Sequence, residues 1–195
     1  MAIWVCADLH LNHKNIIYYC RQQFNSVEEH DKYVIGRYNS VVGKDDLVYI
    51  LGDVGFSPKD KLAALVKQLN GRKILIIGNH DRLKDNEYAN MGFIQVIHHP
   101  VFYNNNIILS HIPIRECLNS PYTINIHGHL HNNELNLPNF FNVNVEMTDF
   151  LPININVFEE KAKETCVQFR WQPFGSEWYQ DYYKKKAESK ENFDE

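Results

Sequence analysis

The sequence has neither a long hydrophobic run nor a basic amino-terminal segment. None of its apolar stretches approaches the about 18 consecutive apolar residues of a membrane-spanning helix. The first residues, Met1 to Val5, lack the positive charge with which a secretion signal starts. We therefore expect a cytoplasmic protein that makes no contact with membranes.

Cysteine and net positive charge are also scarce. The four cysteines are scattered without a C-x-x-C pair, which argues against a zinc ribbon or a redox dithiol, and we expect them to be reduced. The 20 basic and 24 acidic side chains give a net charge of -4. General nucleic-acid binding is not expected, because it normally requires a basic field. A local positive site for a phosphorylated substrate is compatible with this charge.

The 195 residues fit a single domain, which we place at residues 1–183. The tail at residues 184–195 is charged and nearly without apolar side chains, so we expect it to be disordered. Either Pro173 opens a last helix whose aromatic side packs on the domain, or this aromatic segment is the contact of a homo-oligomer. Its aromatic residues are Phe169, Trp171, Phe174, Trp178, Tyr179, Tyr182 and Tyr183.

Five short runs rich in β-branched residues predict strands, and their near-continuous apolar character indicates strands covered on both faces. The runs are Ile3 to Ala7, Leu47 to Leu51, Ile74 to Ile77, Ile107 to Leu109 and Thr123 to Ile126.

Three segments carry helical signals. Residues 57–71 combine a Ser-Pro start, an apolar stripe and a glycine stop. A second helix begins at Ser26, with Glu29 completing a capping box, and runs towards Tyr38. A third covers Val157 to Phe169. Strands that alternate with helices predict an α/β domain.

Metal-binding residue types follow each predicted strand. The segments are D-L-H (residues 8–10), G-D (52–53), G-N-H-D (78–81), S-H (110–111) and G-H-L-H (128–131). In open α/β sheets, ligands bind at the carboxyl ends of the strands, so we expect all five segments at one edge. One such segment arises often by chance, but five in succession indicate a shared site.

The spacing within these segments suits two metal ions. Residues i and i+2 that leave a strand point to the same side, so the acid–histidine pair at 8 and 10 and the histidine pair at 129 and 131 each present two ligands to one cleft. Asp53 stands alone, and its two carboxylate oxygens can bind one ion each when the ions are about 3.5–4 Å apart. The glycines at 52, 78 and 128 allow sharp turns and leave room for a substrate.

In this order the segments resemble the calcineurin-like metallophosphoesterase superfamily, from about Ala2 to about Phe158. The stretches DLHLNHKNII and DLVYILGDV look closest to the small single-domain phosphoesterases of bacteria and their viruses. The resemblance implies a single α/β domain in which two mixed β-sheets form a sandwich flanked by helices, with a dinuclear metal centre at one edge.

The resemblance also implies a role for each residue. Asp53 would bridge the two ions and His80 would meet the substrate phosphate, so that His80, Asn79 and Asp53 form the catalytic group. The first ion would be held by Asp8, His10 and His131, and the second by Asn79, His111 and His129.

Two positions depart from this pattern or leave alternatives. Val54-Gly55-Phe56 follows the G-D segment where the family often has an acidic or basic residue, so the usual acidic partner of His80 is missing there. Another carboxylate or a backbone carbonyl takes over, or His80 acts mainly as a hydrogen-bond donor. His13 either contacts the phosphate or is a water-exposed histidine at a helix start.

The expected chemistry is hydrolysis of a phosphomonoester or phosphodiester of a small molecule, with a nucleotide or cyclic nucleotide as the favoured class. A metal-bridging hydroxide would attack phosphorus, and His80 would stabilise the transition state or protonate the leaving group. The nitrogen and oxygen donors favour Mn²⁺, Fe, Zn or Ni over Mg²⁺ or Ca²⁺, and we expect Mn²⁺ to support activity in vitro.

Two other functions are compatible with the same segments. A nuclease would show salt-dependent affinity for DNA or RNA, and the net negative charge argues against it. A scaffold without turnover would bind proteins through the aromatic segment, and the complete ligand set argues against it.

Overall fold

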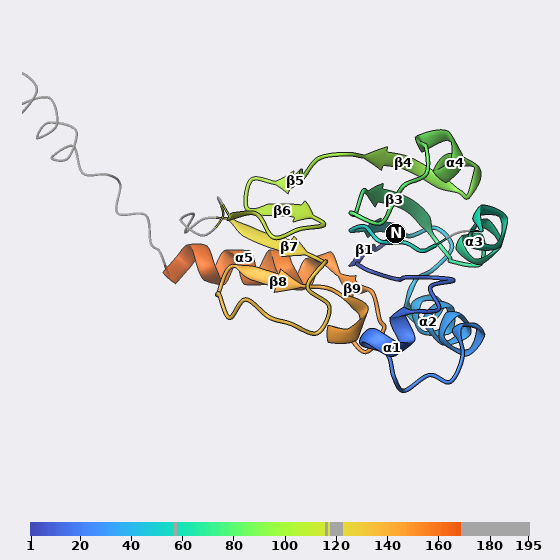
Figure 1. Ribbon diagram of the computed structural model, residues 1–195. Coiled ribbons are helices and arrows are strands. Elements are labelled where there is room, and N and C mark those ends of the chain that lie inside the picture. Colours follow the sequence, from blue (N-terminus) through green and yellow to red (C-terminus); the bar gives the residue numbers. More distant parts are fainter. Residues whose placement is uncertain (57, 116, 118–122, 169–195) are drawn as a thin grey trace, which may run out of the picture.

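The computed structural model describes residues 1–56, 58–115, 117 and 123–168, and within them two mixed β-sheets pack against each other (Figure 1). The five-stranded sheet has the order β4-β3-β2-β1-β9, with β9 antiparallel to β1 and the other pairs parallel. Its strands are β1 (Ile3–Cys6), β2 (Leu47–Ile50), β3 (Arg72–Ile76), β4 (Phe93–Ile97) and β9 (Ile153–Asn154).

The four-stranded sheet has the order β5-β6-β7-β8, with β5 antiparallel to β6. Its strands are β5 (Val101–Asn104), β6 (Ile107–Ser110), β7 (Ile124–His127) and β8 (Phe140–Asn142). The predicted class, two mixed sheets with helices outside them, is therefore confirmed.

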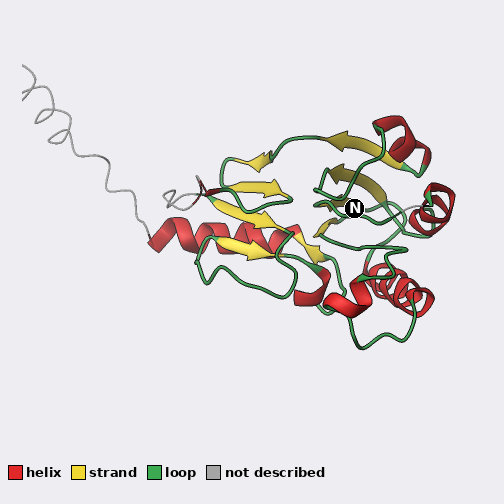
Figure 2. Ribbon diagram, viewed as in Figure 1, coloured by secondary structure: helices red, strands yellow, loops and turns green. Residues whose placement is uncertain are grey.

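Helices lie outside the sheets (Figures 1 and 2). α2, α3 and α4 flank the five-stranded sheet, and α5 packs against β1, β6 and β9. No helix of the described residues is long and apolar enough to span a bilayer. The helices are α1 (Ile16–Tyr19), α2 (Val27–Val41), α3 (Lys59–Val66), α4 (Asp85–Asn90) and α5 (Ile155–Gln168), and a 3-10 turn covers Val145–Met147.

The five-stranded sheet is covered on both faces by apolar side chains. Consecutive residues of β1 enter different cores: Cys6 packs with Val34 of α2, and Val5 packs with Leu109 of β6 and Phe158 of α5. Because side chains alternate along a strand, burial on both faces requires the continuous apolar runs seen in the sequence.

The helix starts follow the sequence more closely than the helix ends. At α2, the Ser26 side chain accepts the Glu29 backbone N–H at 3.1 Å, which confirms the predicted cap. α3 ends at Val66, earlier than the stop expected at Gly71, and its expected cap Ser57 lies outside the described residues. α5 begins at Ile155, before the predicted Val157.

Several short elements escaped the sequence patterns. β4, β5, β8, β9, α1 and α4 were not predicted, and the four strands among them bury only part of their side chains. The predicted tail and the aromatic segment from Phe169 onward lie outside the described residues.

The carboxyl ends of parallel strands from both sheets meet at one place. The Asp8 backbone N–H donates to the Gly52 carbonyl at 3.1 Å, which joins the ends of β1 and β2. His111, which follows β6, donates from Nδ1 to the carbonyl of Leu51, which follows β2, at 2.8 Å. This contact between the sheets brings the five polar segments together.

Candidate metal centre

A continuous chain of contacts links six of the seven predicted metal ligands, and the seventh, His131, stacks on His10 with ring centroids 5.1 Å apart. His10 Nε2 lies 3.6 Å from an oxygen of Asp8 and 3.7 Å from Oδ2 of Asp53. The other oxygen of Asp53 lies 3.7 Å from Nε2 of His111. Nε2 of His111 in turn lies 2.8 Å from Oδ1 of Asn79 and 3.2 Å from Nδ1 of His129.

The backbone at the ligand positions is unusual. Asp8, His10, Asp53, His129 and His131 all have positive φ, between 49° and 69°. Residues other than glycine seldom adopt this left-handed region, and such strain concentrates at functional sites. We expected residues i and i+2 to point the same way because the backbone is extended. The backbone at these positions is left-handed instead, so that reason is wrong. The side chains converge because the loops turn after each strand.

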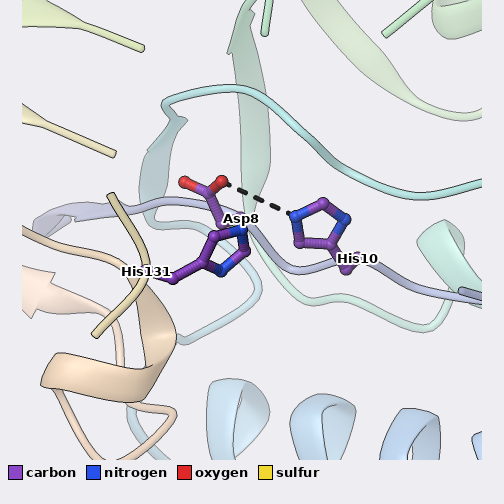
Figure 3. Close-up of side chains that lie close together, drawn as sticks. All are labelled: Asp8, His10 and His131. Carbon is purple, nitrogen blue, oxygen red and sulfur yellow. Dashed lines mark ion pairs between the residues drawn. The ribbon is translucent and has the colours of Figure 1, made fainter. Parts of the chain in front are cut away.

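The first donor group consists of Asp8, His10 and His131, whose ligand atoms lie within 4.8 Å of one another (Figure 3). Both Oδ1 of Asp8 and Nε2 of His10 are buried without a hydrogen-bond partner among the described residues. Buried polar atoms are normally paired, and an unpaired one costs free energy. A cation between these facing atoms would satisfy both, so this group fits a metal ion.

The electrostatics of this group also fit a cation. Burial is the main cause that raises the pKa of Asp8 well above its usual value. Burial likewise lowers the pKa of His10 well below its usual value. A metal ion offsets the cost of burying the carboxylate and binds the imidazole in its neutral form.

The second donor group consists of Asn79, His111 and His129. His111 donates from Nδ1 to the Leu51 carbonyl, so in the neutral ring Nε2 carries a lone pair. That lone pair faces the amide oxygen of Asn79 at 2.8 Å. Two acceptors at this distance need a cation or a proton between them, and imidazole and amide donors suit a divalent transition metal.

Asp53 lies between the two groups and is almost completely buried. One of its oxygens faces His10 and the other faces His111. Oδ1 also accepts the backbone N–H of His80 at 2.9 Å. The arrangement gives each donor group one oxygen of the same carboxylate.

Two of the predicted glycines make room for these carboxylates. A Cβ at Gly78 would lie 2.3 Å from Oδ1 of Asp53, and a Cβ at Gly128 would lie 2.3 Å from Oδ2 of Asp8. We expected these glycines to leave room for a substrate. At these two positions the space is instead filled by the carboxylates of Asp53 and Asp8.

A buried pair behind the first group was missed in the sequence. The Arg21 guanidinium is fully buried and donates to the backbone carbonyls of Asp8 and Leu9 and to Oε1 of Glu146. The same Glu146 oxygen accepts from Nδ1 of His131 at 2.9 Å. The pair thus holds the strained first loop and orients His131, a role that partners behind metal ligands commonly have.

The contacts among Arg21, Glu146 and His131 shift the pKa values of His131 and Glu146. Burial works to lower the pKa of His131, but Cys20, Glu146 and Asp8 together raise it to about 10. Burial works to raise the pKa of Glu146, but His131 and Arg21 lower it to about 2. In the metal-free protein His131 is therefore protonated at neutral pH, beside an ionised Glu146.

Asp81, the last residue of the G-N-H-D segment, had no expected role. Its buried carboxylate accepts the backbone N–H groups of Gly78 at 2.9 Å, Asp53 at 2.7 Å and Val54 at 3.0 Å. Asp81 thereby ties the loop after β3 to the loop after β2. Its place two residues after Asn79 is the signal that could have identified it.

His80 and His13 lie on the exposed side of the first group. The His80 ring is exposed and packs near Phe56, with ring centroids 5.3 Å apart. No described carboxylate or carbonyl bonds to its ring nitrogens, so the expected replacement partner is not found among the described residues. The half-buried His13 ring stacks on Phe56 at 3.8 Å and lies near His10. Burial, followed by the charges of His80 and Arg21, lowers the pKa of His13 to about 4.

Several known proteins are similar to this chain in sequence or in fold. The uncharacterized protein MJ1445 of Methanocaldococcus jannaschii is 34% identical over 173 residues, which cover 80% of this chain and 88% of that protein. The gene 66 protein of Mycobacterium phage L5 is 46% identical over 81 residues, 40% of this chain and 39% of the phage protein. The structure of AQ665, a protein of unknown function from Aquifex aeolicus, matches with a TM-score of 0.64 and 27% identity over 82% of this chain and 98% of that one. Residues 1–194 match the calcineurin-like phosphoesterase family, and the chain belongs to that family.

Proposed function

We propose that this protein uses two divalent cations to hydrolyse a phosphate ester of a small molecule, with nucleotides or cyclic nucleotides as the substrate class. The main support for this proposal is the position of Asp53. Its two oxygens each lie 3.7 Å from a different histidine, His10 and His111. A carboxylate shared in this way suits two ions about 3.5–4 Å apart, the arrangement that supports in-line displacement at phosphorus.

The charges of the donor set suit an anionic substrate. Asp8 and Asp53 are the two carboxylates of the predicted set, and the other donors are imidazoles and one amide, so two bound divalent cations would keep a net positive charge. When bound, such cations attract phosphate oxygens and lower the pKa of water. Most of the catalysis in phosphoryl transfer is positioning and electrostatic stabilisation. The four buried donors of this site are suited to supply both, namely Asp8, His10, Asp53 and His111.

His80 is the chain's own candidate for proton transfer. It projects into solvent beside His10, with ring centroids 6.0 Å apart, and it directly follows the ligand Asn79. From this place its ring can donate a proton to the leaving alkoxide. The half-buried His13, with its lowered pKa, is neutral at neutral pH and serves as a hydrogen-bond donor to a phosphate oxygen.

The metal should be a transition ion. Four imidazoles dominate the donor set, and imidazole suits Mn, Fe, Zn and Ni better than Mg or Ca, which prefer oxygen donors. We propose Mn²⁺ as the ion that supports activity in vitro, with Fe, Zn and Ni as the other candidates.

Calorimetry and turnover together test the proposal. Metal-free protein should bind two equivalents of Mn²⁺ and then hydrolyse p-nitrophenyl phosphate, bis(p-nitrophenyl) phosphate or a cyclic nucleotide. Asp53→Asn should lose the shared carboxylate and with it the second equivalent, whereas Asp45→Asn, at an exposed position, should behave as the unchanged protein. If the protein binds two equivalents of Mn²⁺ but hydrolyses none of these esters, the proposed catalytic activity is wrong. Preference for DNA or RNA over all small esters would assign a nuclease instead.

A further inference from the structure

A cavity of about 590 Å³ opens beside the second donor group. Three segments form its walls: residues 76–79 after β3, 98–100 between β4 and β5, and 111–115 after β6. Its size falls within the roughly 300–1,000 Å³ typical of pockets that bind small molecules. Because Asn79 and His111 line both the cavity and the metal centre, a molecule whose phosphate sits at the centre can extend into the cavity.

The walls combine aliphatic surfaces with a few polar groups. Ile76, Pro100, Ile112 and Ile114 supply apolar surface, and Ile112 keeps 52% of its surface exposed although it is a large aliphatic residue. No carboxylate lines the cavity among the described residues. An aliphatic wall without a facing carboxylate suits a ligand that has an apolar face.

The polar groups of the cavity are two imidazoles and one guanidinium. His98 is already engaged, with Nε2 2.8 Å from Oδ1 of Asp85. His99 bonds through Nδ1 to the Pro100 carbonyl at 3.0 Å, so its other nitrogen stays available. Arg115 is exposed and makes no ion pair with any residue that the structure describes. Planar groups such as a guanidinium stack on aromatic rings and donate to ring heteroatoms.

We propose, on the basis of the proposed function, that this cavity binds the nucleobase of a nucleotide substrate. A nucleobase is a flat ring with apolar faces and a polar edge. Its faces match the isoleucine and proline surfaces, and its edge matches the free nitrogen of His99 and the guanidinium of Arg115. A second phosphate fits less well, because the aliphatic walls would strip its water without replacing those hydrogen bonds. A short alkyl group would leave most of the cavity unfilled.

Two variants at equally exposed isoleucines test the cavity. Ile112→Asp places a charge on its wall, and Ile94→Asp is the matched control, since Ile94 on β4 is 51% exposed and does not line the cavity. The substrates are p-nitrophenyl thymidine 5′-phosphate and methyl p-nitrophenyl phosphate, which share a leaving group and differ in the nucleoside. Adenosine monophosphate and glycerol phosphate form the corresponding monoester pair.

The unchanged protein should prefer the nucleoside member of the pair it hydrolyses. Ile112→Asp should lower that preference, as a ratio of kcat/KM values, by about tenfold or more, the effect of one charge placed against an apolar ligand face. Ile94→Asp should keep the preference. Saturation-transfer NMR with thymidine and metal-free protein gives a readout without turnover: the ring protons should contact the unchanged protein and the Ile94→Asp variant only.

The outcomes separate the two proposals. If the unchanged protein hydrolyses both members of a pair equally and Ile112→Asp changes neither rate, the nucleobase site is wrong and the phosphoesterase stands. If no ester is hydrolysed, the proposed function fails, and thymidine binding that depends on Ile112 still supports the cavity. Thymidine binding that Ile112→Asp leaves intact contradicts the cavity in either case. If Ile112→Asp does not fold, Ile112→Ala and Arg115→Gln replace it, and each should lower the preference by a smaller factor, because each removes a contact without adding a charge.

Discussion

Oε1 of Glu146 lies 2.9 Å from Nδ1 of His131, on the side of the imidazole ring away from Nε2. This contact directs Nε2 of His131 towards the first donor group, where Asp8 and His10 face each other. The same carboxylate oxygen neutralises the fully buried guanidinium of Arg21. One buried acid therefore orients a predicted metal ligand and compensates a buried charge, and the first three predictions follow from it.

Glu146→Gln should weaken the binding of the first Mn²⁺ ion by about 10–100-fold, the usual effect of removing a partner behind a metal ligand. The amide keeps the size of the side chain but not its charge, so it holds the His131 ring less firmly. Titration calorimetry of metal-free protein measures the effect. Glu134→Gln, at an exposed position outside the centre, is the control. An unchanged affinity in Glu146→Gln would remove this role from Glu146.

Binding of the first ion should release a proton from His131. The cause is its pKa, raised to about 10 in the metal-free protein despite the opposing effect of burial, whereas a metal ligand must be neutral. Mn²⁺ affinity should therefore rise with pH up to about 10. In the metal-free protein, the stability contributed by this group is complete below pH 6.5 and is lost as the pH rises through about 10. Calorimetry in two buffers of different ionisation enthalpy counts the proton, and its absence in the unchanged protein would contradict the assignment.

Arg21→Met should lower the free energy of unfolding by about 3–5 kcal/mol, because it breaks a buried ion pair and leaves the Glu146 carboxylate with His131 as its charged partner. It also removes the donors to the Asp8 and Leu9 carbonyls, so the loop that carries Asp8 should lose its shape. Arg37→Met is the matched control, since Arg37 pairs with the exposed Asp149 and should cost less than about 1 kcal/mol. Urea unfolding measures the free energy of unfolding of both variants. Equal losses would show that burial of the Arg21–Glu146 pair does not determine its contribution to stability.

The convergence of the predicted ligands at one place could be foreseen from the sequence, and the residues behind them could not. Asp8, Asp53 and His129 each follow a short apolar run, and this local pattern survives in the fold. The Arg21–Glu146 contact joins residues 125 positions apart, and nothing local distinguishes a buried arginine from a solvated one. Only the resemblance to a family pointed to two sheets.

Local conformation at the site was also beyond the sequence. The argument from strand geometry placed Asp8 with His10 correctly, but both residues have left-handed backbone conformations. Tertiary contacts, such as the bond from the His10 N–H to the Asp53 carbonyl, hold those conformations against their intrinsic cost. β4 and β5 escaped prediction for another reason: exposed positions interrupt the continuous burial that marks the predicted strands.

His80→Ala should lower kcat by about 10²–10⁴, the range for loss of a general acid, while both Mn²⁺ ions stay bound. The reason is that the His80 ring is exposed and bonds to no ligand, and only its backbone N–H contacts Asp53, which alanine retains. Steady-state kinetics and metal analysis of the same sample decide it. Gln95→Ala, a change at an exposed position of β4 outside the centre and the cavity, should leave catalysis intact. Metal loss in His80→Ala would contradict its proposed part in proton transfer.

Gly78→Ala should disrupt the shared carboxylate, because the added Cβ would lie 2.3 Å from Oδ1 and 2.6 Å from the backbone nitrogen of Asp53. Neither atom belongs to a flexible side-chain end, so Asp53 must move by a substantial fraction of an ångström. Since displacements of about 1 Å cost about 10²-fold in rate, activity should fall at least that far and one Mn²⁺ equivalent should be lost. Gly36→Ala in α2 is the control: a Cβ there meets no atom within 4 Å, and alanine in a helix interior should stabilise the fold by about 0.5–1 kcal/mol. If Gly78→Ala keeps both ions and full activity, then Asp53 does not need its observed position, and the shared carboxylate cannot be the basis of the centre.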